Sequence, residues 1–330
     1  MDFGSLFGQT IEQAFGPLAI VYCLAAIGLN VHFGYTGLLN FGQAAFMAVG
    51  GYAMASFVQT WGLSMWLGML VGIGLTIVLA LLLGIPTLRL RADYLAIVTI
   101  AAAEALRQTV GSVTLLEYFG GQDGRQGNFA REFRDLNPFD EGLTIGPVSW
   151  SANVFWVMVV GWALVALCCL IVWALMRSPW GRVLKAIRED EDAARSLGKN
   201  VYSYKMQSLI IGGIFGAFAG FIYGLSKNAV IPTDYATDTT FFAYTVLLVG
   251  GAARVFGPVV GAILFWGLIS ALSVFFTQAT RSDLIPDSIM SNDQASLMRF
   301  IVLGLALMLL MIFRPQGIFG DRKELAIDGR

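Results

Sequence analysis

The sequence predicts an all-α, polytopic membrane helix bundle, and its composition and hydropathy pattern carry that prediction. The chain of 330 residues is 57% hydrophobic and only 13% charged, with a mean hydropathy of +0.70. A soluble domain carries about 25% charged residues, so we expect this chain to be solvated mainly by membrane lipid. The net charge of −1 gives no basic surface of the kind that binds nucleic acid, and no nucleic-acid partner is expected.

The apolar residues gather in nine runs, each of which we interpret as a membrane-crossing helix. About 20 apolar residues are needed to span a bilayer as a helix. The runs are 17–33, 43–58, 63–87, 93–112, 153–176, 206–226, 239–252, 255–276 and 297–313. The stretch before the first run has neither Lys nor Arg, which favours a retained helix over a cleaved signal peptide. The sequence therefore predicts about nine spans, within a range of eight to ten.

Two of the nine runs are short and contain a pair of glycines. Run 43–58 holds Gly50-Gly51, and run 239–252 holds Gly250-Gly251. Short apolar segments interrupted by glycine are typical of the broken helices that line transport sites. We expect either run to be a broken or re-entrant helix.

The distribution of Lys and Arg predicts which loops lie on which side of the membrane. One alternating set of loops holds 14 of the 21 basic residues: 34–42, 88–92, 177–205 and 253–254, with the tail 314–330. The opposite set holds five: the N-terminus, 59–62, 113–152, 227–238 and 277–296. Basic residues concentrate in cytoplasmic loops, so we expect the first set inside, the N-terminus outside and the C-terminus in the cytoplasm.

Polar residues near the two short runs are candidates for a translocation pathway. A Phe-Gly turn lies beside each short run, and unwound backbone at such turns can face a substrate. The candidates are Asn30, Asn40, Phe41, Gly42, Gln43, Glu104, Phe256 and Gly257. The alternative, that these turns are glycine-mediated packing surfaces, stays open. His32 has two interpretations as well, a proton relay or a packed neutral side chain.

Glu104 lies in the middle of run 93–112, with Arg107 three residues later on the same helical face. An isolated carboxylate within a membrane costs several kcal/mol, so we expect the two side chains to pair. The pair either lines a cavity or holds two helices together.

The segment 177–205 has the pattern of a capped amphipathic helix. Ser178 and Pro179 suit its beginning, and Gly198 suits its end. An interrupted apolar stripe and an acidic cluster lie between them. A solvated connector needs neither caps nor a stripe, so we interpret 178–198 as a docking helix.

The stretch Asp192-Ala-Ala-Arg-Ser-Leu-Gly198 resembles the Glu-Ala-Ala-x-x-x-Gly core of the cytoplasmic loop in permeases of bacterial ABC importers. Asp stands where that family has Glu, and the Ile-x-Leu-Pro that often follows has no clear match. The resemblance implies that this helix couples the permease to an ATPase. The implied coupling residues are Arg188, Asp192, Ala193, Ala194, Leu197 and Gly198.

Four further stretches resemble permease subunits for branched-chain amino acids, a pattern that urea-importer permeases largely share. They are 28–52, 88–95, 256–262 and 313–319. The resemblance implies one permease domain over 1–330 in the bacterial inner membrane. It also implies two ATPase subunits, a second homologous permease and an extracytoplasmic solute-binding protein as partners, with ATP bound by the ATPases and no cofactor on this chain. We expect loop 113–152 either to meet the binding protein or to pack as a lid.

Three alternatives to this function remain. A urea or short-amide permease has a similar sequence pattern. An ion-coupled secondary transporter needs buried acidic residues, and only Glu104 qualifies. A membrane enzyme needs a polar catalytic cluster, which a chain with one histidine and no paired Asp motif does not indicate. The sequence also has no phosphate-binding loop of the Gly-x-x-x-x-Gly-Lys-Ser/Thr type, so we expect a transporter subunit rather than an enzyme.

Overall fold

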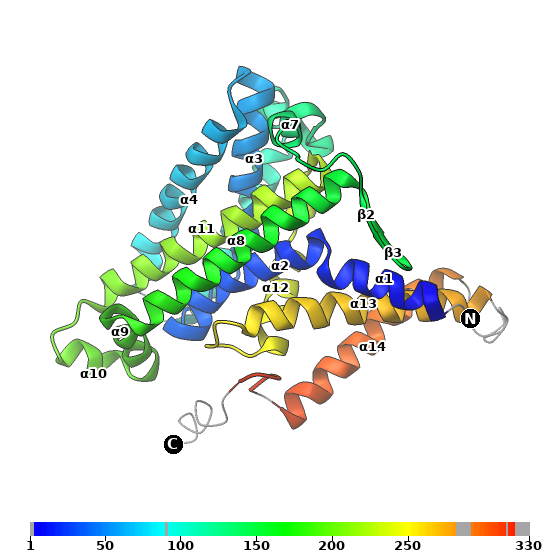
Figure 1. Cartoon of the computed structure of the whole chain (residues 1–330). Coiled ribbons are helices and arrows are strands. Elements are labelled where there is room, and N and C mark those ends of the chain that lie inside the picture. The colour runs from blue at the N-terminus through cyan, green and yellow to red at the C-terminus, as the bar shows by residue number, and fades with distance from the viewer. Residues whose placement is uncertain (1–2, 90–91, 282–291, 315, 321–330) are drawn as a thin grey trace.

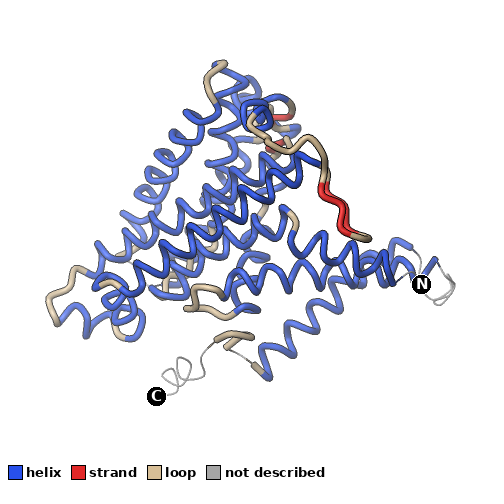
Figure 2. Tube along the Cα trace, in the orientation of Figure 1, coloured by secondary structure: helices blue, strands red, loops and turns tan. Residues whose placement is uncertain are grey.

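The computed structural model describes residues 3–89, 92–281, 292–314 and 316–320. Helices make up almost all of this part of the chain (Figures 1 and 2). The main helices are α1 (Phe3–Phe15), α2 (Pro17–Leu29), α3 (Gln43–Trp61), α4 (Met65–Thr87), α5 (Ala92–Val110), α8 (Ala152–Arg177), α11 (Val201–Lys227), α12 (Thr237–Gly250), α13 (Gly257–Arg281) and α14 (Asn292–Phe313). Each of the nine predicted apolar runs coincides with a helix, which confirms the all-α class.

Five helical stretches are long and apolar enough to cross a membrane. They are Gly4–Tyr35, Met65–Thr87, Ala152–Arg177, Val201–Lys227 and Gly257–Thr280. A shorter apolar helix covers Leu297–Phe313. A polytopic membrane bundle is therefore confirmed, whereas the number of nine spans stays a prediction.

Helices α2 and α11 form the centre of the bundle. The most apolar part of Gly4–Tyr35, the stretch that contains α2, is 83% buried, and that of α11 is 78% buried. The corresponding parts of α4, α8 and α13 are only 33% buried. Helix α11 packs against α2, α3 and α4, and α2 also packs against α8, α12 and α13. The outer helices turn large apolar side chains outward, such as Leu82 on α4 and Leu170 on α8. This arrangement suits a lipid solvent, which rewards an apolar exterior.

Helix α2 passes directly into a π-helical segment, Asn30–Tyr35. Just before it, Gly28 crosses Gly212 of α11 with no room for a side chain on either residue. A Cβ atom on Gly28 would collide with the Gly212 carbonyl oxygen and the Gln43 amide, and a Cβ on Gly212 would collide with the Gly28 carbonyl oxygen and the His32 ring. Backbone contact at this crossing brings the side chains that follow Gly28 against α11.

One helix was not predicted, and one prediction about a helix was wrong. Helix α1, which packs along α13, was not expected from the sequence. The pair Gly50-Gly51 lies inside the continuous helix α3, where Gly50 packs against Ala217 of α11, so run 43–58 is not broken. The second pair does mark an end, because α12 stops at Gly250 and Gly251 takes a φ of 111°.

One group of loops gathers at one end of the bundle. It contains short elements: η2 (Val113–Leu115), α6 (Leu116–Phe119), η3 (Gly121–Asp123), β1 (Arg125–Gln126), η4 (Asn128–Ala130), α7 (Arg131–Asp135), β2 (Leu143–Ile145), β3 (Val148–Trp150), β4 (Ala229–Val230) and η5 (Pro232–Tyr235). Strand β1 pairs antiparallel with β4, and β2 with β3. The Arg125 guanidinium donates to Thr60 Oγ1 at 2.7 Å. Loops 59–62, 113–152 and 227–238 thus contact one another, as expected of loops on one side of a membrane.

The opposite end of the bundle carries α9 (Pro179–Glu189), α10 (Glu191–Ser196) and the described C-terminal residues (Figure 1). There the backbone N–H groups of Ile318 and Phe319 donate to the carbonyl oxygens of Val249 and Gly250, at 3.0 and 3.1 Å. The loops that are rich in Lys and Arg therefore also gather together. These contacts agree with the charge pattern for the loops that the structure describes, whereas most of loop 277–296 and of the tail 314–330 lies outside the described residues.

Candidate functional site

Four buried polar side chains meet where α2 ends and α3 begins, and we call Asn30, His32, Asn40 and Gln43 the polar junction. None is more than 1% exposed. Asn40 lies at its middle: its Nδ2 donates to His32 Nδ1 at 3.0 Å and to Gln43 Oε1 at 3.4 Å. Its Oδ1 accepts from the Gly42 backbone N–H at 2.9 Å. Buried polar groups are stable only when their hydrogen bonds are satisfied. His32, Asn40 and Gln43 bond to one another, whereas Asn30 bonds to backbone groups.

The polar junction is fixed to the central helix α11. His32 Nε2 donates to the Leu209 carbonyl oxygen at 3.1 Å, and Gln43 Nε2 donates to the Gly212 carbonyl oxygen at 3.1 Å. Because Nε2 donates and Nδ1 accepts, the geometry fits the neutral histidine with its proton on Nε2. Both ring nitrogens are thus occupied within the protein, which favours the packed interpretation of His32 over the proton relay.

Asn30 connects the polar junction to the turn after α12. Its Oδ1 accepts from the Ala253 N–H at 2.8 Å, and its Nδ2 donates to the Arg254 carbonyl oxygen at 2.7 Å. Ala253 has a φ of 59°, a left-handed conformation that costs an L-residue about 1–2 kcal/mol. The two bonds from Asn30 hold this strained turn in place.

Phe41 and Gly42 lie at the edge of the polar junction. The Phe41 ring lies 4.9 Å from that of Tyr244 between centroids, and its N–H donates to Thr99 Oγ1 at 3.0 Å. The Tyr244 hydroxyl donates to the Asn40 carbonyl oxygen at 2.9 Å. Sequence reasoning missed Thr99 of α5 and Tyr244 of α12. The sequence signal that could have identified both residues is a hydroxyl group inside a predicted membrane span.

The other candidate pathway residues lie elsewhere. Glu104 pairs with Arg107 as predicted, with Arg107 Nη2 at 2.6 Å from Glu104 Oε1, and its side chain is 41% exposed. Phe256 is 66% exposed on the outer surface, whereas Gly257 packs against the Gly251 carbonyl. The structure thus brings together five of the eight candidates: Asn30, Asn40, Phe41, Gly42 and Gln43. A pathway role for all eight stays a prediction.

The predicted docking helix 178–198 consists of two helices. Helix α9 ends at Glu189, and Asp190 begins α10 by accepting from the N–H groups of Asp192 and Ala193, both at 2.9 Å. An Asp at this position is a strong helix N-cap, which explains the break. Ser178 occupies the N-cap position of α9 and Pro179 its first turn, as predicted, but the Ser178 hydroxyl donates back to the Leu175 carbonyl oxygen at 2.6 Å instead of capping the helix.

The predicted coupling residues of α10 fall into buried and exposed groups. Ala194 is 3% exposed and packs against Ile187 and Val201. Leu197 is 79% exposed, and Gly198 beside it ends the segment with a φ of 76°. Asp192 forms an ion pair with Arg195 at 2.8 Å, and Ala193 is exposed. The turn at 197–198 therefore presents an apolar side chain to solvent.

Arg188 joins this docking segment to the polar junction. Its Nη1 donates to the carbonyl oxygen of Gly34, within the π-helical segment, at 2.6 Å. A cavity of about 260 Å³ lies beside this contact and is bordered by Thr36, Gly37, Ile187 and the ion pair of Glu191 with Lys205. Charge-assisted hydrogen bonds are shorter and stronger than neutral ones, so this bond ties the two segments together.

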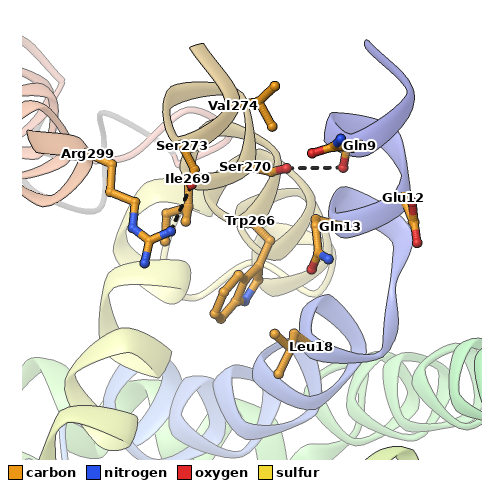
Figure 3. A pocket seen from close by; sticks show the side chains of 10 residues that line it. All are labelled: Gln9, Glu12, Gln13, Leu18, Trp266, Ile269, Ser270, Ser273, Val274 and Arg299. Atoms are coloured by element: carbon orange, nitrogen blue, oxygen red, sulfur yellow. Dashed lines mark hydrogen bonds between the residues drawn. The ribbon is translucent and has the colours of Figure 1, made fainter. Parts of the chain in front are cut away.

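A larger cavity of about 560 Å³ lies between α1, α13 and α14 (Figure 3). Arg299 borders it and donates from Nη1 to Ser273 Oγ at 2.9 Å, and Ser270 donates to the Gln9 carbonyl oxygen at 3.1 Å. None of the candidate pathway residues lines it. Within the described residues, no group of three or more His, Cys, Asp or Glu side chains is placed to hold a metal ion.

The fold defines a multi-pass helical membrane protein in which α2 passes into a π-helical segment beside a buried polar junction. Residues 17–312 match the family described as "Branched-chain amino acid transport system / permease component", and the chain belongs to this family. It is accordingly a membrane permease of the ABC type, and the family expectation from the sequence is confirmed.

Several relatives are similar along most of the chain. The high-affinity branched-chain amino acid transport system permease protein LivM of Escherichia coli (strain K12) is 31% identical over 314 residues, which cover 91% of this chain and 68% of the relative. A probable LivM of Methanocaldococcus jannaschii is 25% identical over 92% of this chain and 91% of the relative. The nucleoside ABC transporter permease protein NupC of Lactococcus lactis is 24% identical over 85% and 86%.

Among solved structures, a chain of PsaBC from Streptococcus pneumoniae in complex with Fab covers 90% of this chain and 90% of that chain. Its sequence is 15% identical and its TM-score is 0.42, a similarity too low to assign a shared fold.

Proposed function

We propose that the chain is a permease subunit of an ABC importer that moves branched-chain apolar amino acids into the cell, powered by separate ATPase subunits. The observation that carries the proposal is the similarity to branched-chain amino acid permeases along 91% of the chain. The proposal extends to two ATPases, a second homologous permease and an extracytoplasmic solute-binding protein.

The orientation follows from charge. The end of the bundle with α9, α10 and most of the basic residues faces the cytoplasm, by the preference of Lys and Arg for that side. The ATPase receives the turn at Leu197 and Gly198, because this turn belongs to the stretch that resembles the coupling loop of ABC importer permeases and its side chain at Leu197 is exposed. The binding protein docks at the opposite end, over 113–152.

Transport proceeds by alternating access. Closure of the ATPases pushes α10, and Arg188 passes the displacement to the π-helical segment through the Gly34 carbonyl. The polar junction then moves against α11 and the turn at Ala253. The polar groups of the junction are bonded to the protein itself, so few of them are left to bind the ammonium and carboxylate groups of a passing amino acid.

Reconstitution tests the proposal. The complex, purified through a tag on this chain, is placed in proteoliposomes with ATP on the side of α10 and the binding protein on the other side. We expect uptake of radiolabelled leucine, isoleucine and valine that depends on both ATP and the binding protein. Co-purification of ATPases and a second permease gives the composition. ATP-dependent efflux, or no ATPase in the preparation, overturns the importer.

The same vesicles separate the alternatives. Urea, short amides and a nucleoside are offered in parallel with leucine, since one relative is a nucleoside permease. Preferential uptake of any of these replaces the proposed substrate while leaving the ABC class intact. Uptake by the chain alone, driven by an ion gradient without ATP, assigns it instead to the secondary transporters.

A further inference from the structure

The cavity of about 560 Å³ between α1, α13 and α14 has a polar lining, although it lies within an apolar bundle (Figure 3). Six of its ten described lining residues are polar or charged: Gln9, Glu12, Gln13, Ser270, Ser273 and Arg299. The three from α1 are spaced three and four residues apart, so they share one face of that helix. Small-molecule sites have volumes of about 300–1,000 Å³, so the cavity is large enough for a ligand.

Two buried N–H donors at this cavity lack an acceptor. Trp266 Nε1 and Arg299 Nε have no hydrogen-bond partner in the part of the chain that the structure describes. Arg299 Nη1 donates to Ser273 Oγ, and the guanidinium carbon lies 4.8 Å from the centre of the Phe300 ring, but no described carboxylate pairs with it. A buried donor without an acceptor is costly, and more so when it belongs to a charged group. An acceptor supplied by a ligand would satisfy both donors.

The two sides of the cavity differ in charge. The acceptor that suits a guanidinium beside an indole N–H is an anionic oxygen, and the planar guanidinium matches the two oxygens of a carboxylate. On the side of α1, Gln9 and Gln13 carry amide oxygens that can accept from an ammonium group, and Glu12 adds a negative charge. Arg299 and Glu12 lie on opposite sides of the cavity (Figure 3). The lining therefore favours a zwitterion over a simple anion.

We propose that this cavity binds an α-amino acid with an apolar side chain. Its carboxylate accepts from Arg299 and from the Trp266 N–H, and its ammonium group faces α1. Its side chain lies against the apolar part of the lining, which includes Leu18, Ile269 and Val274. The choice of an amino acid rests on the proposed function, whereas the requirement for a zwitterion rests on the lining residues. A phospholipid headgroup is the competing source of a zwitterion.

The position of the cavity suits an early step of uptake. Trp266 and Val274 lie nine and seventeen residues beyond Gly257, where α13 begins, or about 14 and 26 Å along the helix. Because Gly257 belongs to the end of the bundle that faces the cytoplasm in the proposed orientation, the cavity lies toward the outer side. The Trp266 ring is centred 5.1 Å from that of Tyr22 on α2. A ligand on Trp266 is thus one ring away from the helix that leads to the polar junction.

Equilibrium binding of radiolabelled leucine tests the site. The full complex is placed in phosphatidylcholine nanodiscs, without ATP and without the solute-binding protein. Arg299→Gln removes the cation and should weaken binding about tenfold or more, whereas Arg299→Lys keeps the charge and should restore part of the affinity. Trp266→Phe removes one N–H and should weaken binding about fivefold. The matched control is Arg131→Gln on α7, a cation 77% exposed and outside the cavity, which should leave binding unchanged.

Two analogues test the charged groups of leucine separately. Isocaproate is leucine without its amino group, and isoamylamine is leucine without its carboxylate. We expect isocaproate to displace leucine weakly and to lose this ability in R299Q. Isoamylamine should not displace leucine, because it offers no acceptor to Arg299 and Trp266. Equal displacement by the two analogues would overturn the assignment of the carboxylate to Arg299.

The remaining outcomes separate this site from the proposed function. Normal leucine uptake by the reconstituted complex, without leucine binding that depends on Arg299, overturns the site and leaves the proposed function intact. Leucine binding that depends on Arg299, without leucine uptake, keeps the site and overturns the proposed function. Phosphatidylethanolamine retained through Arg299 in native mass spectrometry, with no leucine bound, assigns the cavity to a lipid headgroup and overturns the inference. Equal loss of leucine binding in R299Q and R131Q also overturns it.

Discussion

Asn30 and Ala253 lie 223 residues apart in the sequence, and the Asn30 side chain accepts a hydrogen bond from the Ala253 backbone N–H at 2.8 Å. The same side chain donates to the carbonyl oxygen of Arg254 at 2.7 Å. One amide therefore binds both the donor and the acceptor of a turn that links α12 to α13. Only a side chain with both functions can do so, which gives Asn30 a role that neither Asp nor Leu can replace.

Asn30→Asp should destabilise the protein. A carboxylate keeps the bond from Ala253 but faces the Arg254 carbonyl oxygen with a second acceptor, and a buried unsatisfied or repelled polar group costs about 1–3 kcal/mol.

Ala253→Gly should act in the opposite direction, because glycine adopts a positive φ at little cost and relieves about 1 kcal/mol. Thermal unfolding of the detergent-solubilised variants measures both. Equal melting temperatures for N30D and the unmodified chain would contradict the assignment.

Arg188→Gln should uncouple ATP hydrolysis from transport. The variant loses the bond to the Gly34 carbonyl, while the rest of the docking segment keeps its packing. Couplings between sites are typically worth about 1–3 kcal/mol, so uptake per ATP hydrolysed should fall by about tenfold. Parallel uptake and ATPase assays in proteoliposomes give the ratio, with R182Q on the same helix as the matched control. A normal ratio in R188Q would place the coupling elsewhere.

Leu197→Asp should abolish recovery of the ATPases while leaving the permease folded. The Leu197 side chain is 79% exposed, so its replacement changes the free energy of unfolding by less than about 0.5 kcal/mol. Ala194→Asp differs, because Ala194 is buried and a carboxylate there disrupts the segment itself. Pull-down of ATPases, read against thermal unfolding, separates the two effects. Full ATPase recovery by L197D would show that the docking surface is not at this turn.

Gly212→Ala should destabilise the centre of the bundle. The added methyl group collides with the Gly28 carbonyl oxygen and the His32 ring, and overpacking of this kind costs about 1–3 kcal/mol or more. Gly74→Ala on α4 is the matched control, because no atom lies within 4 Å of the added carbon. We expect G74A to be as stable as the unmodified chain or slightly more stable. The yield of folded protein and its unfolding temperature, measured for G212A and G74A, test this difference in stability.

The sequence predicted those features that depend on local pattern. Each of the nine apolar runs coincides with a helix, and Glu104 pairs with Arg107 three residues later. Gly198 ends the docking segment, as its position in the sequence predicts. Among the described residues, the loops that the basic residues divide into two sets also make contacts within each set. Each of these features depends on residues that lie within one or two helical turns of each other, or on the preference of a residue type for lipid, for water or for one side of the membrane.

Features that depend on distant partners were missed. The helix α1 is short and amphipathic, and its burial comes from α13 at the other end of the chain. The break at Asp190 depended on which of four neighbouring acidic residues would cap a helix. Thr99 and Tyr244 join the polar junction only because three helices meet there. Gly50-Gly51, expected to break a helix, instead gives α11 room to approach.

The π-helical segment Asn30–Tyr35 contains wider turns than the helix it continues. In an α-helix each residue advances about 1.5 Å and rotates about 100° around the axis. Conversion of this stretch to ordinary α-helix would therefore turn the following side chains onto a new face and shift them by about the rise of one residue. The Arg188 bond at Gly34 and the Asn30 bonds at Ala253 hold the wide form in place. The π-helical segment thus sets which face the side chains after Tyr35 present to α3 and α11, and the bonds at Gly34 and Ala253 hold that rotational register.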